Sequence, residues 1–129
     1  MNAYSDCMAK ILLEGRPGIG KTTVAIRCVK LLAAAGVPVR GFTTSEWRQE
    51  GRRVGFYVEV IDGESAVLAH VDYPGPPRVG RYGVDVEAFE RLVLPALGVD
   101  KEAVWVIDEL GRMELASRHF QTRIIELVA

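Results

Sequence analysis

The stretch GRPGIGKT, residues Gly15 to Thr22, decides how the rest of the chain is interpreted. It has the form G-x-x-x-x-G-K-[ST], in which successive backbone N–H groups of a glycine-rich turn surround the phosphates of a nucleotide. In this pattern the lysine, here Lys21, reaches the β- and γ-phosphates, and the hydroxyl of Thr22 binds Mg²⁺. The nucleotide-binding residues predicted from this stretch are Gly15, Arg16, Pro17, Gly18, Ile19, Gly20, Lys21, Thr22 and Thr23.

The sequence on either side of the loop supports this interpretation. The mostly apolar run Ala9–Leu13 precedes the loop and predicts a short buried strand. After the loop, apolar residues at helical spacing predict a helix over Lys21–Ala35, which Gly36 ends. Strand, glycine loop and helix in this order are the context that a phosphate-binding loop requires.

The middle of the chain predicts further strands. Val37–Phe42 is expected to be a second strand parallel to the first, because a helix connects the two. A hairpin is expected over Glu46–Ile61, with its turn near Gly51, and a third antiparallel arm over Ala66–Val71. The glycine- and proline-rich stretch Tyr73–Gly83 predicts a long surface loop.

The last third predicts two helices and one strand. Asp85 is placed to cap a helix over Val86–Leu97, which Pro95 should kink or end. The continuous apolar run Ala103–Ile107 is typical of a strand buried on both faces of a parallel sheet. A final helix is expected over Ser117–Val128.

Composition sets limits on the class of protein. The 129 residues are 49% hydrophobic and 26% charged, as in an ordinary globular domain. A net charge of −1 argues against a dedicated nucleic-acid or membrane surface, and no apolar run is long enough to span a membrane. Two cysteines make no disulfide framework, so a reducing cytoplasm is expected, with Cys28 as a small core residue on the first helix.

An acidic pair follows the apolar run at Ala103–Ile107. Ligands bind at the carboxyl ends of strands in an open α/β sheet, so Asp108 is expected to face the same crevice as Lys21 and to bind Mg²⁺. Glu109 beside it is a candidate catalytic base for an attacking water, which favours hydrolysis over transfer to another substrate. The alternative is a solvated glutamate at a strand end.

Other polar residues are weaker candidates. Thr43, Thr44 and Glu46 follow the second predicted strand, where they would touch Mg²⁺ or water, or simply form a polar turn. An arginine that offsets charge on the transferring phosphoryl group is also expected, and Arg112, four residues past Asp108, is favoured as this catalytic group. The other candidates are Arg16, Arg78 and Arg81.

Four segments together resemble one family, the P-loop nucleoside-triphosphatases typified by thermophilic and cancer-related NTPases. They are GRPGIGKTT at Gly15–Thr23, GFTTSEWRQEGRRVGF at Gly41–Phe56, VGRYGVDVEAFE at Val79–Glu90 and VIDELGRMELASRHF at Val106–Phe120. The resemblance implies a three-layer α/β sandwich, with a mostly parallel sheet and an inserted antiparallel hairpin. It also implies slow Mg²⁺-dependent hydrolysis of ATP, GTP and other nucleoside triphosphates, with Asp108 and Glu109 as the second motif.

The sequence differs from this family in one respect. Members normally continue past the helix near Ser117 with a further strand and helix, whereas this sequence ends at Ala129, so we expect a fragment or a shortened single domain over residues 1–129. Two other functions stay open: a nucleotide or small-molecule kinase, which shares the loop, and a non-catalytic nucleotide switch. The stretch Asp108–Gly111 matches the D-x-x-G of GTPase switches, but no N-K-x-D motif is present.

Overall fold

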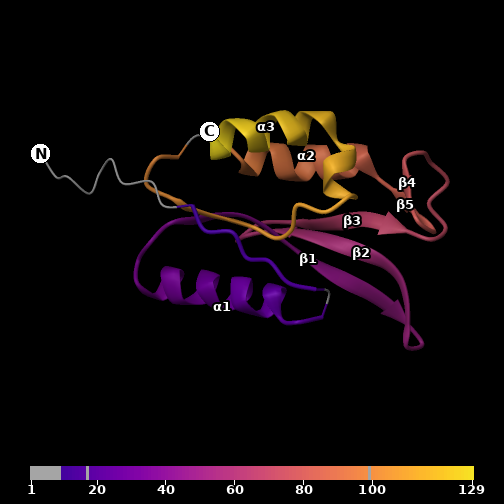
Figure 1. Ribbon diagram of the computed structural model, residues 1–129, viewed down its shortest axis with the longest axis horizontal. Helices are drawn as coiled ribbons and strands as arrows, with labels where there is room; N and C mark the ends of the chain where they lie inside the picture. Colours follow the sequence, from indigo (N-terminus) through magenta and orange to yellow (C-terminus); the bar gives the residue numbers. More distant parts are fainter. Residues whose placement is uncertain (1–9, 17, 99) are drawn as a thin grey trace, which may run out of the picture.

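The protein is an α/β structure with one mixed sheet between two layers of helices (Figure 1). The computed structural model describes residues 10–16, 18–98 and 100–129. Its elements, in chain order, are α1 (Lys21–Ala34), β1 (Val39–Gln49), β2 (Arg52–Val60), β3 (Ser65–His70), β4 (Arg78–Val79), β5 (Tyr82–Val84), α2 (Val86–Ala96), β6 (Val104–Ile107), the 3₁₀ helix η2 (Glu114–Ala116) and α3 (Arg118–Val128).

The sheet is mostly antiparallel, which corrects the prediction of a mostly parallel sheet. Its strands lie in the order β4-β5-β3-β2-β1-β6, and among the described residues only β1 and β6 run parallel. Short turns at Gly51 and Gly63 join β1 to β2 and β2 to β3, and such turns pair strands antiparallel. The long connection through α2 returns the chain to β1, so β6 alone runs parallel to its neighbour.

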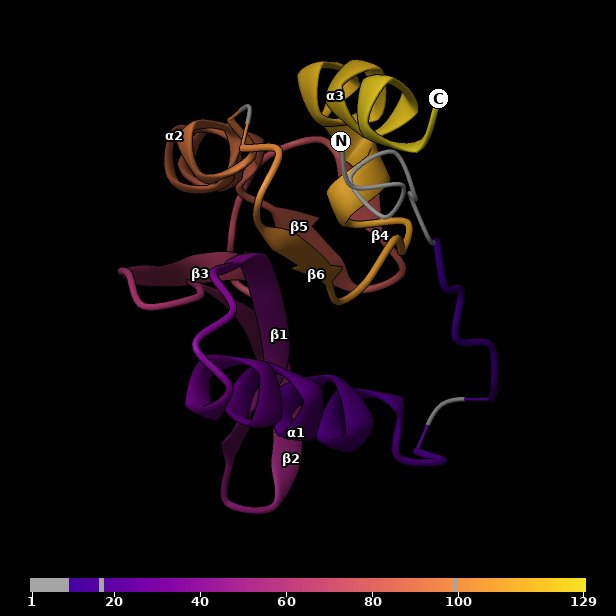
Figure 2. The same cartoon turned by 90° about the vertical axis from the view of Figure 1, so that its left-hand side faces the viewer.

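The two faces of the sheet are covered unequally, as Figure 2 shows, with α2 and α3 on one face and α1 on the other. The core lies on the α2–α3 face, where the rings of Phe42, Phe89 and Phe120 meet edge to face at centroid distances of 5.1–5.8 Å. On α1 the buried residue is Ala25, and Cys28 is exposed, so the prediction of Cys28 as a core residue is wrong.

The strand predicted over Ala9–Leu13 is not formed in its described part. Residues 10–16 have neither helix nor strand, and the side chains of Ile11 and Leu12 are 86% and 74% exposed; Ala9 lies outside the described residues. A strand needs a neighbour for its backbone hydrogen bonds. Among the described residues, no strand pairs with the outer edge of β6, and residues 10–16 do not pair with that edge either.

Most other predicted elements are confirmed. Helix α1, the β1–β2 hairpin, β3 and the two C-terminal helices lie where the sequence predicted them. Asp85 caps α2 by accepting a hydrogen bond from the Ala88 N–H at 3.0 Å, and Ser117 caps α3 by accepting one from Phe120 at 3.0 Å. Two predictions were too simple. The stretch Tyr73–Gly83 contains β4 and the first two residues of β5, and β6 lies at the edge of the sheet with Val104 39% exposed.

Candidate phosphate and acidic site

Two glycines of the loop have backbone conformations that favour glycine. Gly18 and Gly20 have φ of 82° and 108°, values that residues with a side chain rarely adopt. Gly20 is the N-cap of α1 and leaves its first turn without a side-chain cap. The first N–H groups of a helix have no partner within it, so they are free to bind an anion at the loop. Pro17 lies outside the described residues.

Lys21 closes the loop onto itself. Its ammonium donates a hydrogen bond to the carbonyl oxygen of Gly15, six residues earlier. A Cβ added to Gly15 would lie 2.8 Å from a methyl carbon of Ile19, so the loop is narrow at this point. Thr22 is half-buried, whereas Thr23 and Arg16 are exposed. The loop therefore holds Lys21 over its own backbone, next to the open end of α1.

Asp108 is the buried acid of the second motif. It directly follows β6, and its N–H donates to the carbonyl oxygen of Phe42 at 3.1 Å. The residue is 7% exposed, and its Oδ2 atom is buried without a hydrogen-bond partner. Buried polar atoms without a partner are rare, and an ionised carboxylate oxygen of this kind suits a cation. The residue present thus fits the magnesium ligand that the sequence predicted.

Glu114 is a buried acid that the sequence did not single out. It begins η2, is 3% exposed, and follows the turn that carries Glu109 and Arg112, both exposed. Burial raises the pKa of its carboxyl to about 7; backbone N–H groups of Glu114 and Gly111 oppose the rise, and the charges of Glu109 and Asp108 add to it. The segment around Glu114 is too short for a periodic pattern, so nothing local marks it as buried.

The loop and the acidic segment lie toward the same end of the sheet. In Figure 1, the start of α1 lies at the end of the sheet toward which β1 runs. Because β6 runs parallel to β1, Asp108, which follows β6, also lies on the side toward this end. Among the described residues, no hydrogen bond or ion pair joins Lys21 or Thr22 to Asp108, Glu109 or Arg112. The described part of the chain contains no cluster of three or more His, Cys, Asp or Glu side chains that could hold a metal ion.

The weaker candidates lie on β1, where Thr43 directly follows Phe42, the residue whose carbonyl oxygen accepts from the Asp108 N–H. Thr43 and Thr44 lie inside β1 rather than after it, because this strand continues to Gln49. Glu46 forms ion pairs with Arg48 and Arg53 at 2.8 and 3.3 Å; the hydrogen bond from Arg48 is the main reason that the pKa of the Glu46 carboxyl is lowered.

Two of the candidate arginines lie across the sheet from Asp108. Arg78 and Arg81 lie on and beside β4 and β5, which three strands separate from β6. The Arg78 guanidinium donates hydrogen bonds to the carbonyl oxygens of Tyr73 and Arg81, and Arg81 donates one to the hydroxyl of Tyr82 at 3.1 Å. Neither is therefore placed to act at Asp108.

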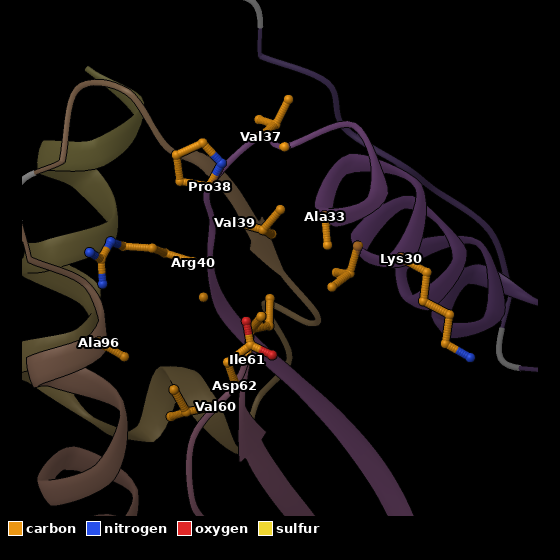
Figure 3. Close-up of a pocket in the computed structure, with 13 residues that line it drawn as sticks. Lys30, Ala33, Val37, Pro38, Val39, Arg40, Val60, Ile61, Asp62 and Ala96 are labelled. Carbon is orange, nitrogen blue, oxygen red and sulfur yellow. The ribbon is translucent and has the colours of Figure 1, made fainter.

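A separate cavity of about 690 Å³ lies at the opposite end of α1 from the loop (Figure 3). Ala33 of α1, Val37 and Arg40 near the start of β1, and Val60 and Asp62 near the end of β2 line it. Arg40 in its wall is paired with Asp100 at 2.8 Å, and the cavity includes no residue of the glycine loop or of the acidic pair, so it does not belong to the candidate site.

These features place the chain in the class of α/β proteins that hold a mixed sheet between helices. Within this class, the family model described as NTPase matches residues 10–129, so the chain belongs to the NTPase family. Of its helices in the described ranges, none is long and apolar enough to cross a membrane.

Two proteins similar in sequence are named as nucleoside-triphosphatases. The nucleoside-triphosphatase THEP1 of Thermotoga sp. (strain RQ2) is 43% identical over 114 residues, which cover 87% of this chain and 63% of that protein. The cancer-related nucleoside-triphosphatase of Homo sapiens is 44% identical over 121 residues, covering 85% and 64% of the two chains. The chain thus spans less than two thirds of the length of these relatives.

Two solved structures are also similar. The solution structure of a human cancer-related nucleoside triphosphatase matches with a TM-score of 0.73 at 42% identity. The crystal structure of THEP1 from the hyperthermophile Aquifex aeolicus matches with a TM-score of 0.72 at 33% identity. Each match covers 88% of this chain and 66% of the other.

Proposed function

We propose that the protein hydrolyses nucleoside 5′-triphosphates, ATP and GTP among them, to the diphosphate and inorganic phosphate in a Mg²⁺-dependent reaction. The observation that carries the proposal is the glycine loop, whose Gly18 and Gly20 conformations open onto the uncapped first turn of α1. The names of the relatives, all nucleoside-triphosphatases, support it. The fold proposed with this activity is that of a P-loop NTPase, and the compartment is the cytoplasm.

The phosphates of the substrate lie along residues 15–23 in this proposal. Backbone N–H groups of the loop surround them, and Lys21 exchanges its bond to Gly15 for one to the β- and γ-phosphates. The hydroxyl of Thr22 and the unpartnered Oδ2 of Asp108 would hold Mg²⁺. When bound, the ion offsets negative charge that builds up on the phosphate oxygens.

Glu109 is the proposed base. Water attacks the γ-phosphorus, the bond from that phosphorus to the β–γ bridging oxygen breaks, and the diphosphate leaves with the electron pair of this bond. The proton of the water passes to the exposed carboxylate of Glu109 and then to solvent. Arg112, exposed three residues further on, is proposed to offset charge on the transferring group.

Replacing Lys21 with alanine should lower the rate of phosphate release from Mg·ATP and Mg·GTP about 10²- to 10³-fold, because one preorganised positive donor is lost at the developing charge. The matched control is Lys30→Ala, which removes an exposed lysine from the same helix and should keep the wild-type rate. The measurement is colorimetric phosphate release under saturating nucleotide.

Two outcomes would contradict the proposed hydrolysis. Phosphoryl transfer that appears only when an acceptor is added would make the protein a kinase. Nucleotide binding by wild type without phosphate release would leave a binding module.

A further inference from the structure

The proposed reaction uses Asp108 and Glu109 but leaves Glu114 without a role, although Glu114 is the most buried of these three acids. Its side chain is 3% exposed, on η2, between the end of β6 and the start of α3. Burying a carboxyl near two other acids works against folding whenever the group is ionised. A costly buried group beside a candidate site indicates a function there.

Gly111 shows how closely Glu114 and Glu109 approach the same piece of backbone. A Cβ added to Gly111 would lie 2.8 Å from Glu109 Oε1 and 2.9 Å from Glu114 Oε2. Because both oxygens lie this close to one point, they are at most 5.7 Å apart. A side chain at position 111 would displace one or both carboxyl groups, so the glycine leaves room for both beside this turn.

Glu114 also lies close to the backbone of this turn. Its Oε2 is 2.9 Å from the position of a Cβ added to Gly111, and the N–H of Gly111 opposes the rise that burial causes in the pKa of the Glu114 carboxyl. On the other side, the N–H of Leu115 donates to the carbonyl oxygen of Gly111 at 3.0 Å. Gly111 therefore lies against the Glu114 carboxyl, and its carbonyl is tied to the backbone of η2.

We propose that Glu114 is a positioning residue for hydrolysis: its buried carboxyl, lying against Gly111, holds the turn 109–112 so that the Glu109 carboxylate faces the reacting phosphate. This inference rests on the proposed hydrolysis and on Glu109 as its base. Glu114 acts through Glu109 and touches neither the nucleotide nor the water. Its effect is on the rate of the chemical step, because the nucleotide is held by a different segment, residues 15–23.

The test compares Glu114→Ala, which removes the acceptor, with Glu114→Gln, which keeps an oxygen acceptor of the same length. Loss of an orienting outer partner typically costs about 10- to 100-fold in activity. We expect Glu114→Ala to lose this much in kcat with KM for ATP within about threefold of wild type, and Glu114→Gln to regain most of kcat. The exposed Glu64, in the turn between β2 and β3, gives the control Glu64→Ala, which should match wild type.

A second readout does not depend on turnover. Amide hydrogen exchange at Gly111, measured without nucleotide, should speed up at least tenfold in Glu114→Ala and stay near wild type in Glu114→Gln. Unchanged exchange and unchanged kcat in Glu114→Ala, with active wild type, would overturn this inference alone. Equal loss of kcat in both variants would also overturn it, since the charge rather than the oxygen acceptor would then matter. Absence of hydrolysis by wild type would overturn the proposed function and this role together.

Discussion

Replacing Gly41 with alanine is expected to lower the free energy of unfolding by more than about 4 kcal/mol, at the upper end of single-residue effects. Gly41 has φ of 119°, a conformation that a residue with a side chain rarely adopts. Its added Cβ would lie 2.8 Å from the carbonyl carbon of Val106 and would overlap the carbonyl oxygen. Both atoms are backbone, so no side-chain rotation can relieve the overlap.

The damage would fall on the pairing that places Asp108. Gly41 lies opposite Val106 in the parallel pair of β1 and β6, and Asp108 is the residue that directly follows β6. The matched control is Gly51→Ala at the hairpin turn, where φ is 77° but nothing lies within 4 Å, so only about 1–2 kcal/mol of backbone strain is expected. Urea unfolding followed by circular dichroism measures both, and equal stability of the two variants would contradict the close approach of β1 to β6.

Replacing Glu114 with glutamine is expected to stabilise the metal-free protein above neutral pH. The pKa of Glu114 is raised from 4.5 to about 7 in the folded protein, chiefly by burial. Folding therefore favours the protonated carboxyl, and this contribution is complete below pH 4.5 and is lost as the pH rises toward 7. The loss amounts to about 3 kcal/mol over this window, at about 1.4 kcal/mol per pKa unit.

Glutamine carries no charge at any pH, so the Glu114→Gln variant does not lose folding stability between pH 4.5 and 7 in this way. The measurement is the free energy of unfolding of wild type and Glu114→Gln at intervals from pH 4 to pH 8 in EDTA. The difference between the two should grow in favour of the variant from pH 4.5 to 7 and stay level above pH 7. A difference that stays constant over the whole range would show that burial does not raise the pKa of Glu114.

Local signals in the sequence were enough to predict the helices and the hairpin. Asp85 and Ser117 cap α2 and α3 because a side-chain oxygen satisfies N–H groups only two or three residues away. Gly51 lies in the turn between β1 and β2, and short turns give antiparallel pairs. Each of these features is decided by residues close together in the chain, so the sequence alone can indicate it.

Features that depend on distant partners were predicted poorly. Residues 10–13 have the apolar composition of a strand, but a strand forms only beside a neighbour, and composition does not name that neighbour. The same limit explains the wrong expectation of a mostly parallel sheet. The burial of Glu114 likewise depends on how η2 packs near α2 and α3, contacts that no short segment reveals.

The candidate site was predicted in its parts but not in its arrangement. The glycine loop and Asp108 were singled out from sequence because their patterns are contiguous, and the structure shows positive φ at Gly18 and Gly20 and a buried, unpartnered carboxylate oxygen on Asp108. The role of each residue in binding or catalysis stays a prediction, as do those of Glu109 and Arg112.

The most direct measurement of the central proposal is phosphate release from Mg·ATP by wild type and by Asp108→Asn, with EDTA as a second condition. Asparagine keeps the size of the side chain and removes the charge of the buried Oδ2 atom. We expect release by wild type in Mg²⁺, no release in EDTA, and a rate at least about 100-fold lower in Asp108→Asn, since an ionised carboxylate is the ligand that Mg²⁺ prefers. Release by Asp108→Asn at the wild-type rate, or release by wild type that persists in EDTA, would contradict a magnesium-dependent hydrolase centred on this loop and this acid.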